Sequence, residues 1–398
     1  MSVSSLYIHI PFCASLCDYC DFYSVNAANI SEDYIDSFLS ALINDIKRQI
    51  DFFGITEIPA AYIGGGTPSV LGRKIQVLFN ALNGLSVFSP QEFTIEANPE
   101  SLTEEFLSVC AGYAVNRLSL GIQTFSGKSR IAVNRAGCYS KLEEKLALAS
   151  RFFCADVSRT SLSCDLITGL PYQSKNIILD DIKRLISFAP SHISLYSLSV
   201  DKNTILYKNS ENNTIKLPDS DISDILWLTG RETLISAGYE HYEVSNFAYP
   251  AVKRCLHNIR YWRMNNWIGA GPAASGTFID ENKGTARRFT YLSDVDAYIK
   301  SMNKKEPAMN GNLFNTMSVC EILDKNILLR ECLLMGFRYI DGPDPALFFN
   351  RFGITLDSCI ADTLKKWEGK DKMLFLNKFL SDAFLELDRK SELINNFI

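Results

Sequence analysis

Two apolar patterns alternate along the first 240 residues. Short runs of β-branched and aromatic residues are typical of buried strands, whereas longer segments with an apolar residue at every fourth position are typical of amphipathic helices. Residues 31–50 show the helical pattern, with Tyr34, Phe38 and Leu42 on one face and Ser31 at the start. The strand candidates are residues 6–10, 60–66, 93–98, 117–123, 162–169 and 192–198. Six strands that alternate with helices predict a parallel α/β sheet or barrel.

Two further helices are marked by their ends. Ser101 stands three residues before Glu104, the spacing of a capping box, which predicts that a helix begins there. Residues 219–240 form another long helical segment, which we expect to end near Gly238.

The pattern changes after about residue 250. Residues 255–280 are rich in His, Asn, Trp and Gly with little periodicity, and we expect a long structured loop there. From about residue 315 the chain is mainly helical, and the short apolar stretches 373–376 and 384–387 are expected to pair as a small hairpin, or wing. The expected domains are a barrel over 1–250, a bridging segment over 251–314 and a helical, winged C-terminal domain over 315–398.

Polar residues and glycines collect at the ends of consecutive strand candidates. The first strand runs into a cysteine-rich loop, and the second ends in Gly-Gly-Gly-Thr at residues 64–67. The next three strands carry Glu96, Gln123 and Asp165. Because the C-terminal ends of parallel barrel strands share one face, where functional residues gather, we expect a site on that face.

Composition and charge limit the classes of function. The chain has 398 residues, 47% of them apolar, which suits one large domain with a smaller one. The net charge is −5 without a long Lys/Arg run, so a nucleic-acid partner is not expected. No apolar run reaches about 18 residues and the N-terminus lacks the pattern of a signal peptide, which predicts a cytoplasmic location. The eleven cysteines are then expected to be reduced thiols or metal ligands.

Three of these cysteines lie close together in the loop after the first strand. Cys13, Cys17 and Cys20 have the spacing C-x3-C-x2-C, and position 22 is Phe22 rather than a fourth cysteine. A structural zinc site needs four closed ligands, for which His9 is a weaker fourth candidate. A cubane iron–sulfur cluster usually takes four cysteines, so three cysteines leave one iron with an open position.

This loop resembles that of the radical S-adenosylmethionine (SAM) superfamily. The resemblance rests on C-x3-C-x2-C directly after a first strand, with Tyr19 before the last cysteine, and on residues 63–69 (IGGGTPS), which are similar to the superfamily's glycine motif. It implies an α/β fold, a partial (βα)6 TIM-like barrel with a smaller, mainly helical C-terminal domain. It also implies a [4Fe–4S] cluster on Cys13, Cys17 and Cys20, whose open iron chelates SAM.

More of the chain resembles one family within this superfamily, the oxygen-independent coproporphyrinogen III oxidases and their relatives. The similar segments are 7–13, 19–22, 64–69, 96–102, 115–125, 165–174 and 257–262. The residues that the resemblance places in the SAM pocket are Tyr7, Tyr19, Gly65, Gly66, Thr67, Glu96, Gln123, Arg135 and Asp165. Gln123 and Asp165 suit ribose hydroxyls, and Arg135 suits a carboxylate. The chain departs from the family pattern at Gly137, where a histidine is usual, and at Tyr172, where glycine is common.

Two branches of this family differ at two motifs. The oxidases carry a further cysteine two residues after the third cluster ligand, where this chain has Phe22, while the haem chaperone branch, HemW, has Cys-Asp-Phe as here. Residues 257–262 (HNIRYW) match the H-N-x-x-Y-W motif associated with haem in that branch. The resemblance therefore implies that His257, Tyr261 and Trp262 bind haem, since a neutral imidazole can ligate haem iron and aromatic rings can flank a macrocycle. Cys255 is a second candidate for the axial ligand.

The resemblance implies a haem chaperone that holds a [4Fe–4S] cluster, SAM and haem and passes haem to an acceptor protein such as a membrane respiratory enzyme. Whether SAM is cleaved stays open, as do peripheral membrane contact and a homodimer. The alternative is a coproporphyrinogen III oxidase that removes carbon dioxide from propionate side chains. A radical SAM enzyme that modifies tRNA would need a basic surface, which the acidic balance does not favour.

Overall fold

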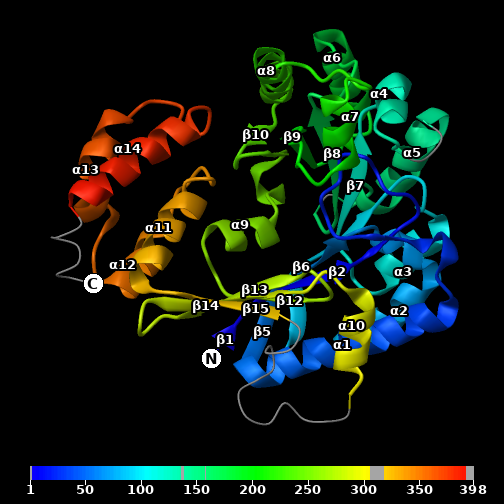
Figure 1. Cartoon of the computed structure of the whole chain (residues 1–398), viewed down its shortest axis with the longest axis horizontal. Coiled ribbons are helices and arrows are strands. Elements are labelled where there is room, and N and C mark those ends of the chain that lie inside the picture. Colours follow the sequence, from blue (N-terminus) through cyan, green and yellow to red (C-terminus); the bar gives the residue numbers. More distant parts are fainter. Residues whose placement is uncertain (1, 136–138, 157, 305–317, 391–398) are drawn as a thin grey trace.

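Six parallel strands form the centre of the molecule (Figure 1). The structure, a computed structural model, describes residues 2–135, 139–156, 158–304 and 318–390. The parallel strands, in spatial order, are β2 (Ser5–Ile10), β5 (Ile55–Gly65), β6 (Phe88–Ala97), β7 (Arg117–Gln123), β8 (Ser161–Thr168) and β9 (His192–Ser197). All six predicted strands are therefore present. Within the described residues β2 and β9 do not pair with each other, so the sheet is an open, partial barrel.

The register of these strands brings the predicted polar positions to one edge. Ile10 pairs with Gly65, Ala97 with Leu120 and Gly121 with Asp165. The strands are buried over most of their length, except near the start of β5 and β6 and at the last two residues of β9, as expected where helices cover the outer face and side chains fill the interior. The C-terminal strand ends therefore lie together and carry the candidate site.

Helices follow the strands, and most of them cover the outer face of the sheet (Figure 1). They are α1 (Glu32–Phe53), α2 (Ile75–Asn83), α3 (Glu104–Gly112), α4 (Gly127–Ala132), α5 (Leu142–Phe153), α6 (Lys175–Ile186), α7 (Ile205–Glu211) and α8 (Ser220–Ser236). Helix α1 begins as predicted, with the Ser31 side chain accepting a hydrogen bond from the Tyr34 amide. The predicted capping box is wrong: Thr103 caps α3, because the Ser101 hydroxyl is engaged with Ser69 at 2.6 Å.

The segment after residue 250 is more regular than the loop that its sequence predicts. It contains α9 (Leu256–Trp262), β12 (Trp267–Ala270), β13 (Ser275–Asp280), β14 (Thr285–Tyr291) and α10 (Val295–Met302). Strand β12 pairs in parallel with β2, and β13, β14 and β15 (Ser318–Leu323) continue the sheet in antiparallel fashion. The segment therefore extends the barrel sheet towards the C-terminal helices.

Short strands complete the described sheets. They are β1 (Ser2–Val3) beside β5, β11 (Asn246–Ala248) beside β9, β10 (Glu240–His241) beside β11, and the pair β3 (Phe12–Cys13) and β4 (Val25–Asn26).

Four helices follow β15 and pack around a second apolar core. They are α11 (Lys325–Gly336), α12 (Pro345–Phe352), α13 (Leu356–Lys366) and α14 (Leu376–Arg389). The core includes Leu329, Phe348 and Phe379. The expected hairpin is wrong, because residues 384–387 lie inside α14, where the buried side chain of Leu387 faces this core.

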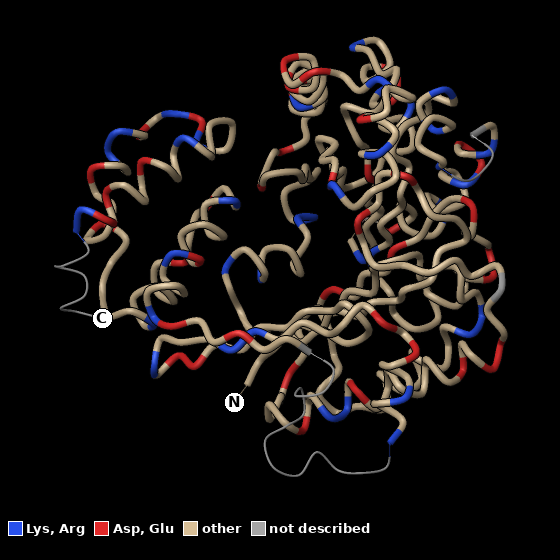
Figure 2. The backbone as a smooth tube through the Cα atoms, viewed as in Figure 1, with Lys and Arg blue, Asp and Glu red and all other residues tan. Residues whose placement is uncertain are grey.

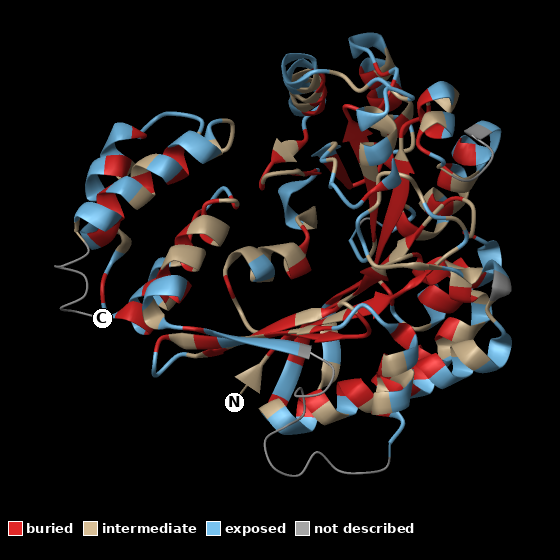
Figure 3. Ribbon diagram, in the orientation of Figure 1, coloured by how far each residue is buried: buried red, intermediate tan, exposed pale blue. Residues whose placement is uncertain are grey.

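The two cores lie on either side of α9, which stands between the barrel and the C-terminal helices (Figures 1 and 3). Acidic and basic residues are interspersed over both parts rather than gathered on one face (Figure 2). In the portion of the chain that the structure describes, no helix has the length and apolar character needed to cross a bilayer.

Candidate functional site

The cysteine loop lies at the C-terminal end of β2. Cys13, Cys17 and Cys20 are free, partly exposed thiols. The loop is fixed by backbone hydrogen bonds, since the Cys20 amide donates to the Cys17 carbonyl (3.1 Å) and the Asp18 amide donates to the Val133 carbonyl (3.0 Å). Burial raises the pKa of Cys20 to about 11, and burial also raises the pKa of Cys13.

His9 is not available as a fourth ligand. Its Nε2 donates to the Tyr23 carbonyl at 2.8 Å, so its Nδ1 accepts from the Tyr7 hydroxyl at 3.2 Å. Among the described side chains no three His, Cys, Asp or Glu groups converge on a single ion. The cysteines of a cubane cluster each bind a different iron, so they need not converge on one point. The loop therefore fits a cluster better than a mononuclear zinc site.

The glycine turn after β5 packs directly against this loop. The Gly66 amide donates to the Ile10 carbonyl at 2.8 Å, and the Thr67 amide donates to the Phe12 carbonyl at 2.7 Å. A Cβ atom on Gly66 would lie 2.7 Å from the Phe12 oxygen, and Gly65 has φ +104°, a conformation that favours glycine. The Thr67 hydroxyl lies 3.4 Å from Cys13 Sγ. Glycine thus allows the turn to approach the first cysteine.

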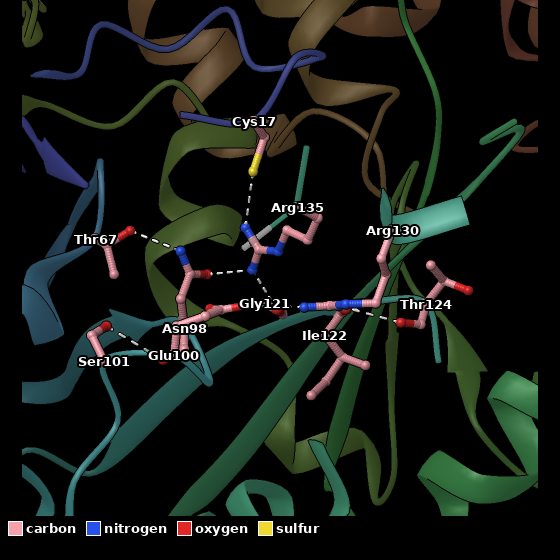
Figure 4. A network of polar contacts seen from close by, with 10 residues as sticks. All are labelled: Cys17, Thr67, Asn98, Glu100, Ser101, Gly121, Ile122, Thr124, Arg130 and Arg135. Atoms are coloured by element: carbon pink, nitrogen blue, oxygen red, sulfur yellow. Dashed lines mark hydrogen bonds and ion pairs between the residues drawn. The ribbon is translucent and has the colours of Figure 1, made fainter. Parts of the chain in front are cut away.

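Arg135 joins the cysteine loop to the strand ends (Figure 4). Its Nη1 donates to Cys17 Sγ at 3.5 Å, and its Nη2 donates at 2.7 Å both to Asn98 Oδ1 and to the Gly121 carbonyl. The Asn98 amide in turn donates to Thr67 Oγ1 at 2.8 Å. Asn98, which the sequence analysis missed, therefore links the arginine to the glycine turn.

A buried ion pair lies next to this network, at the end of β7. Arg130 is almost fully buried and lies 3.0 Å from the Glu100 carboxylate. It also donates to the carbonyls of Ile122 (2.7 Å) and Thr124 (3.3 Å), at the end of β7 (Figure 4). Sequence reasoning missed both charged residues. Their signal was their position, since Glu100 and Arg130 each follow a strand end within a few residues.

The remaining predicted pocket residues lie at the same edge. Glu96 accepts from the Tyr62 hydroxyl at 2.6 Å and from the Gly65 amide at 3.3 Å, and burial raises its pKa to about 7. Asp165 accepts from the Ser119 hydroxyl at 3.3 Å, and burial raises its pKa. Gln123 has φ +67° at a bulge in β7, and its buried Oε1 has no partner among the described residues.

Two tyrosines complete the predicted pocket. Tyr7 contacts His9, and burial raises its pKa; Tyr19 lies near Cys17 and Arg135, and burial raises its pKa as well. Both phenols are therefore neutral at physiological pH and act as hydrogen-bonding or packing groups.

Two departures from the family pattern have different outcomes. Tyr172 has φ +64°, a conformation that glycine adopts without strain, and its half-exposed ring lies under the Lys128 ammonium at 4.0 Å. Gly137 lies outside the described residues.

The three candidate haem residues of α9 have different surroundings. The His257 ring is buried against Tyr62 (centroids 5.1 Å apart) and Tyr7 (6.5 Å apart). The Tyr261 ring lies 4.5 Å from that of Trp267, and Trp262 Nε1 donates to Glu243 at 2.7 Å. Burial lowers the pKa of His257 to about 4, so the imidazole is neutral, and its Nδ1 has no described partner.

Cys255, the other candidate axial ligand, is also buried. Its thiol donates to Glu92 Oε1 at 3.3 Å, and burial raises its pKa. The thiol is therefore protonated and engaged, which makes it a poorer ligand than His257.

The sequence and the fold are similar to those of known proteins. The Radical SAM superfamily model matches residues 7–185. The fold is similar to that of coproporphyrinogen III oxidase (HemN) from Escherichia coli, with a TM-score of 0.73 and 19% identity over 96% of this chain and 90% of that one. The Heme chaperone HemW of Lactococcus lactis is 30% identical over 91% of this chain and 88% of its own length. The chain is a radical SAM protein of the HemN/HemW family. HemW of Escherichia coli is 35% identical over 69% of this chain and 71% of its own length.

Membership of the HemN/HemW family implies a [4Fe–4S] cluster and SAM, and the strand-end site fits both. Three free thiols lie in the loop beside the glycine turn: Cys13 Sγ is 3.4 Å from the Thr67 hydroxyl, and Cys17 Sγ is 3.5 Å from Arg135 Nη1. Two buried polar atoms at this edge, Gln123 Oε1 and Arg135 Nε, have no partner in the described part of the chain. Buried polar groups are rarely left unpaired, which indicates that a polar ligand completes the site.

Proposed function

We propose that this chain is a haem chaperone: a protein that binds haem beside a [4Fe–4S] cluster and SAM and hands haem to an acceptor such as a membrane respiratory enzyme. The observation that carries the proposal is Phe22. Its side chain cannot ligate metal and is 65% exposed at the position where the oxidases have a further cysteine. Curated relatives that are 30% and 35% identical bear the name heme chaperone, which supports the same branch.

In this proposal Cys13, Cys17 and Cys20 each bind one iron of the cluster, and the fourth iron is left for the amino and carboxylate groups of SAM. When bound and reduced, this pair supplies one-electron chemistry at the sulfonium. Side chains of the protein keep the cysteine ligands in position. The Thr67 hydroxyl, which already accepts from Asn98, is free to donate to Cys13 Sγ.

The strand-end residues orient SAM. Glu96, Gln123 and Asp165 are assigned to the polar groups of its ribose and amino acid, and the backbone of Gly65 and Gly66 allows close approach. Arg135 receives a more limited part than the resemblance implies. Its two Nη atoms are engaged within the protein, so it holds the Cys17 loop in position and offers only Nε to the ligand. Tyr7, Tyr19 and Thr67 line the pocket.

His257 is assigned as the haem ligand, with Tyr261 and Trp262 beside the macrocycle. A neutral imidazole with a free ring nitrogen is chemically ready to ligate iron. Since the ring is buried, haem reaches it only when α9 moves from its place between the barrel and the C-terminal helices. A cytoplasmic location, contact with a membrane surface and a homodimer remain predictions.

The test combines two assays on protein whose cluster has been reconstituted anaerobically. Haem titration is expected to give a saturable Soret shift in the wild type and a weaker one in His257→Ala. Coproporphyrinogen III with SAM and a reductant is expected to stay unconverted. Decarboxylation of the porphyrinogen without stable haem binding would instead assign the chain to the oxidase branch. His241→Ala is the matched control, since His241 is a buried histidine that stacks on Phe247.

A further inference from the structure

A cavity of about 510 Å³ opens at the edge of the barrel opposite the cysteine loop. It is lined by Arg117 and Ser161, the first residues of β7 and β8, and by residues 251–254, which lead into α9. Arg117 and Gln123 stand at opposite ends of β7, and a seven-residue strand is about 20 Å long. The cavity is therefore separate from the SAM pocket.

Arg117 carries a buried positive charge that has no ion-pair partner among the described residues. Burial acts to lower its pKa, but the neighbouring Cys255 and Glu92 outweigh burial and raise the pKa. The side chain is 3% exposed, and its Nη1 donates to Ser161 Oγ and to the Lys253 carbonyl, both at 3.1 Å. Its Nε and Nη2 have no hydrogen-bond partner, and no carboxylate forms an ion pair with it, within the described residues. Two of its nitrogens are therefore left to donate to a ligand anion, and a guanidinium with free N–H groups suits a carboxylate.

Lys253 adds a second positive charge to the same cavity. Its ammonium donates to the Thr160 carbonyl at 2.9 Å and has no carboxylate within ion-pair distance among the described residues. Burial and the charge of Arg117 lower its pKa, which is the effect of two cations held close together. An anion between them would relieve this repulsion.

The other charged groups of the lining are engaged within the protein. Arg159 lies 3.6 Å from the Asp156 carboxylate, and the charge of Glu92 acts on Arg117. Glu92 accepts from the amides of Leu256 (2.8 Å) and His257 (2.9 Å), at the start of α9. Arg254 is paired with Glu240. The rest of the lining includes apolar side chains, among them Leu256 and Ile259 of α9. The cavity lining thus combines two cationic side chains, Arg117 and Lys253, with an apolar part formed by residues such as Leu256 and Ile259.

We propose that this cavity binds the propionate carboxylates of haem, with Arg117 and Lys253 as the carboxylate-binding residues and the apolar part of the lining against the macrocycle. The proposal rests on the haem chaperone function. It is independent of which residue ligates the iron. Arg and Lys side chains are suited to carboxylates, and an amphiphilic ligand with two carboxylates matches the two parts of the lining.

The test compares haem with its dimethyl ester, in which both propionates are neutral, on the reconstituted full chain. The wild type is expected to bind haem at least ten-fold more tightly than the ester. Arg117→Met and Lys253→Met should each weaken haem binding at least five-fold and leave ester binding unchanged. Arg151→Met, on the exposed face of α5, is the control and should change neither. Thermal unfolding verifies that each variant folds, and Lys253→Met decides if Arg117→Met does not.

The outcomes separate this inference from the function on which it rests. Equal wild-type affinity for haem and the ester, or variants that bind haem like the wild type, would overturn the inference and leave the chaperone proposal standing. Binding of neither porphyrin would refute both. If inorganic phosphate raises the melting temperature of the wild type but not of the variants, while haem binding is insensitive to them, the cavity is a site for a free anion and the assignment to haem is wrong.

Discussion

Gly66→Ala tests the contact between the glycine turn and the cysteine loop. The added Cβ would lie 2.7 Å from the Phe12 oxygen, 2.8 Å from the Ile10 oxygen and 2.9 Å from the Phe12 nitrogen. Ordinary contacts begin near 3.4 Å, so the backbone on one side must move by several tenths of an ångström. These are backbone atoms that cannot rotate away, and overpacking of this kind costs about 1–3 kcal/mol.

The displacement has a second effect at the cluster. The same backbone carries the hydrogen bonds from Gly66 to Ile10 and from Thr67 to Phe12, and it leads directly into Cys13. We therefore expect Gly66→Ala to lower the free energy of unfolding in urea by about 1–3 kcal/mol and to reduce the iron and sulfide retained after anaerobic reconstitution. Gly112→Ala is the matched control, because a Cβ there meets nothing within 4 Å. A Gly66→Ala protein with control-like stability and full iron content would refute this reasoning.

Three further predictions concern buried charges and the cluster. Burial raises the pKa of Glu243 from 4.5 to about 7, so the folded state holds a proton that the unfolded state releases, and the free energy of unfolding falls as pH rises from about 4.5 to 7. Glu243→Gln should reduce the difference between the free energies of unfolding in urea at pH 5 and pH 8 by about 3 kcal/mol. An unchanged difference would contradict the raised pKa of Glu243. Arg130→Met leaves the Glu100 carboxylate buried and unpaired and should lower the free energy of unfolding by about 3–5 kcal/mol. The double variant with Glu100→Gln should restore part of this free energy. A decrease below about 1 kcal/mol would show that the ion pair does not support the site. Cys17→Ser should abolish the absorbance of the reconstituted cluster, whereas the exposed thiol of Cys320 should be replaceable by serine without loss; a cluster that survives Cys17→Ser would exclude that ligand.

The sequence predicted those parts of the fold whose local pattern and packing agree. The six parallel strands are near-continuous apolar runs, and Ser31 begins α1 in the structure as its position predicts. Where a distant partner competes, the local rule fails. Ser101 has capping-box spacing but bonds Ser69, which leaves Thr103 to cap α3, and residues 384–387 have an apolar pattern that packing against the C-terminal core makes helical.

In the candidate site too, features encoded by a local pattern were predicted, and features that depend on distant partners were not. The cysteines and glycines stand out in sequence because their chemistry requires those residue types at short spacing. Asn98 and Arg135 meet across 37 positions of the chain, and only the register of β6 and β7 brings them together. The burial of His257 between Tyr7 and Tyr62 was equally invisible, since the motif identifies a ligand type without indicating which way α9 faces.

Haem transfer tests the central claim most directly. The reconstituted protein would be loaded with haem, freed of excess by gel filtration, and mixed with the haem-free form of a respiratory enzyme; the Soret band and the activity of the separated acceptor would then be measured. The account predicts that haem leaves the loaded protein and that acceptor activity is restored faster than with an equal amount of free haem. Haem that stays on the protein, or an acceptor that gains nothing over free haem, would contradict it.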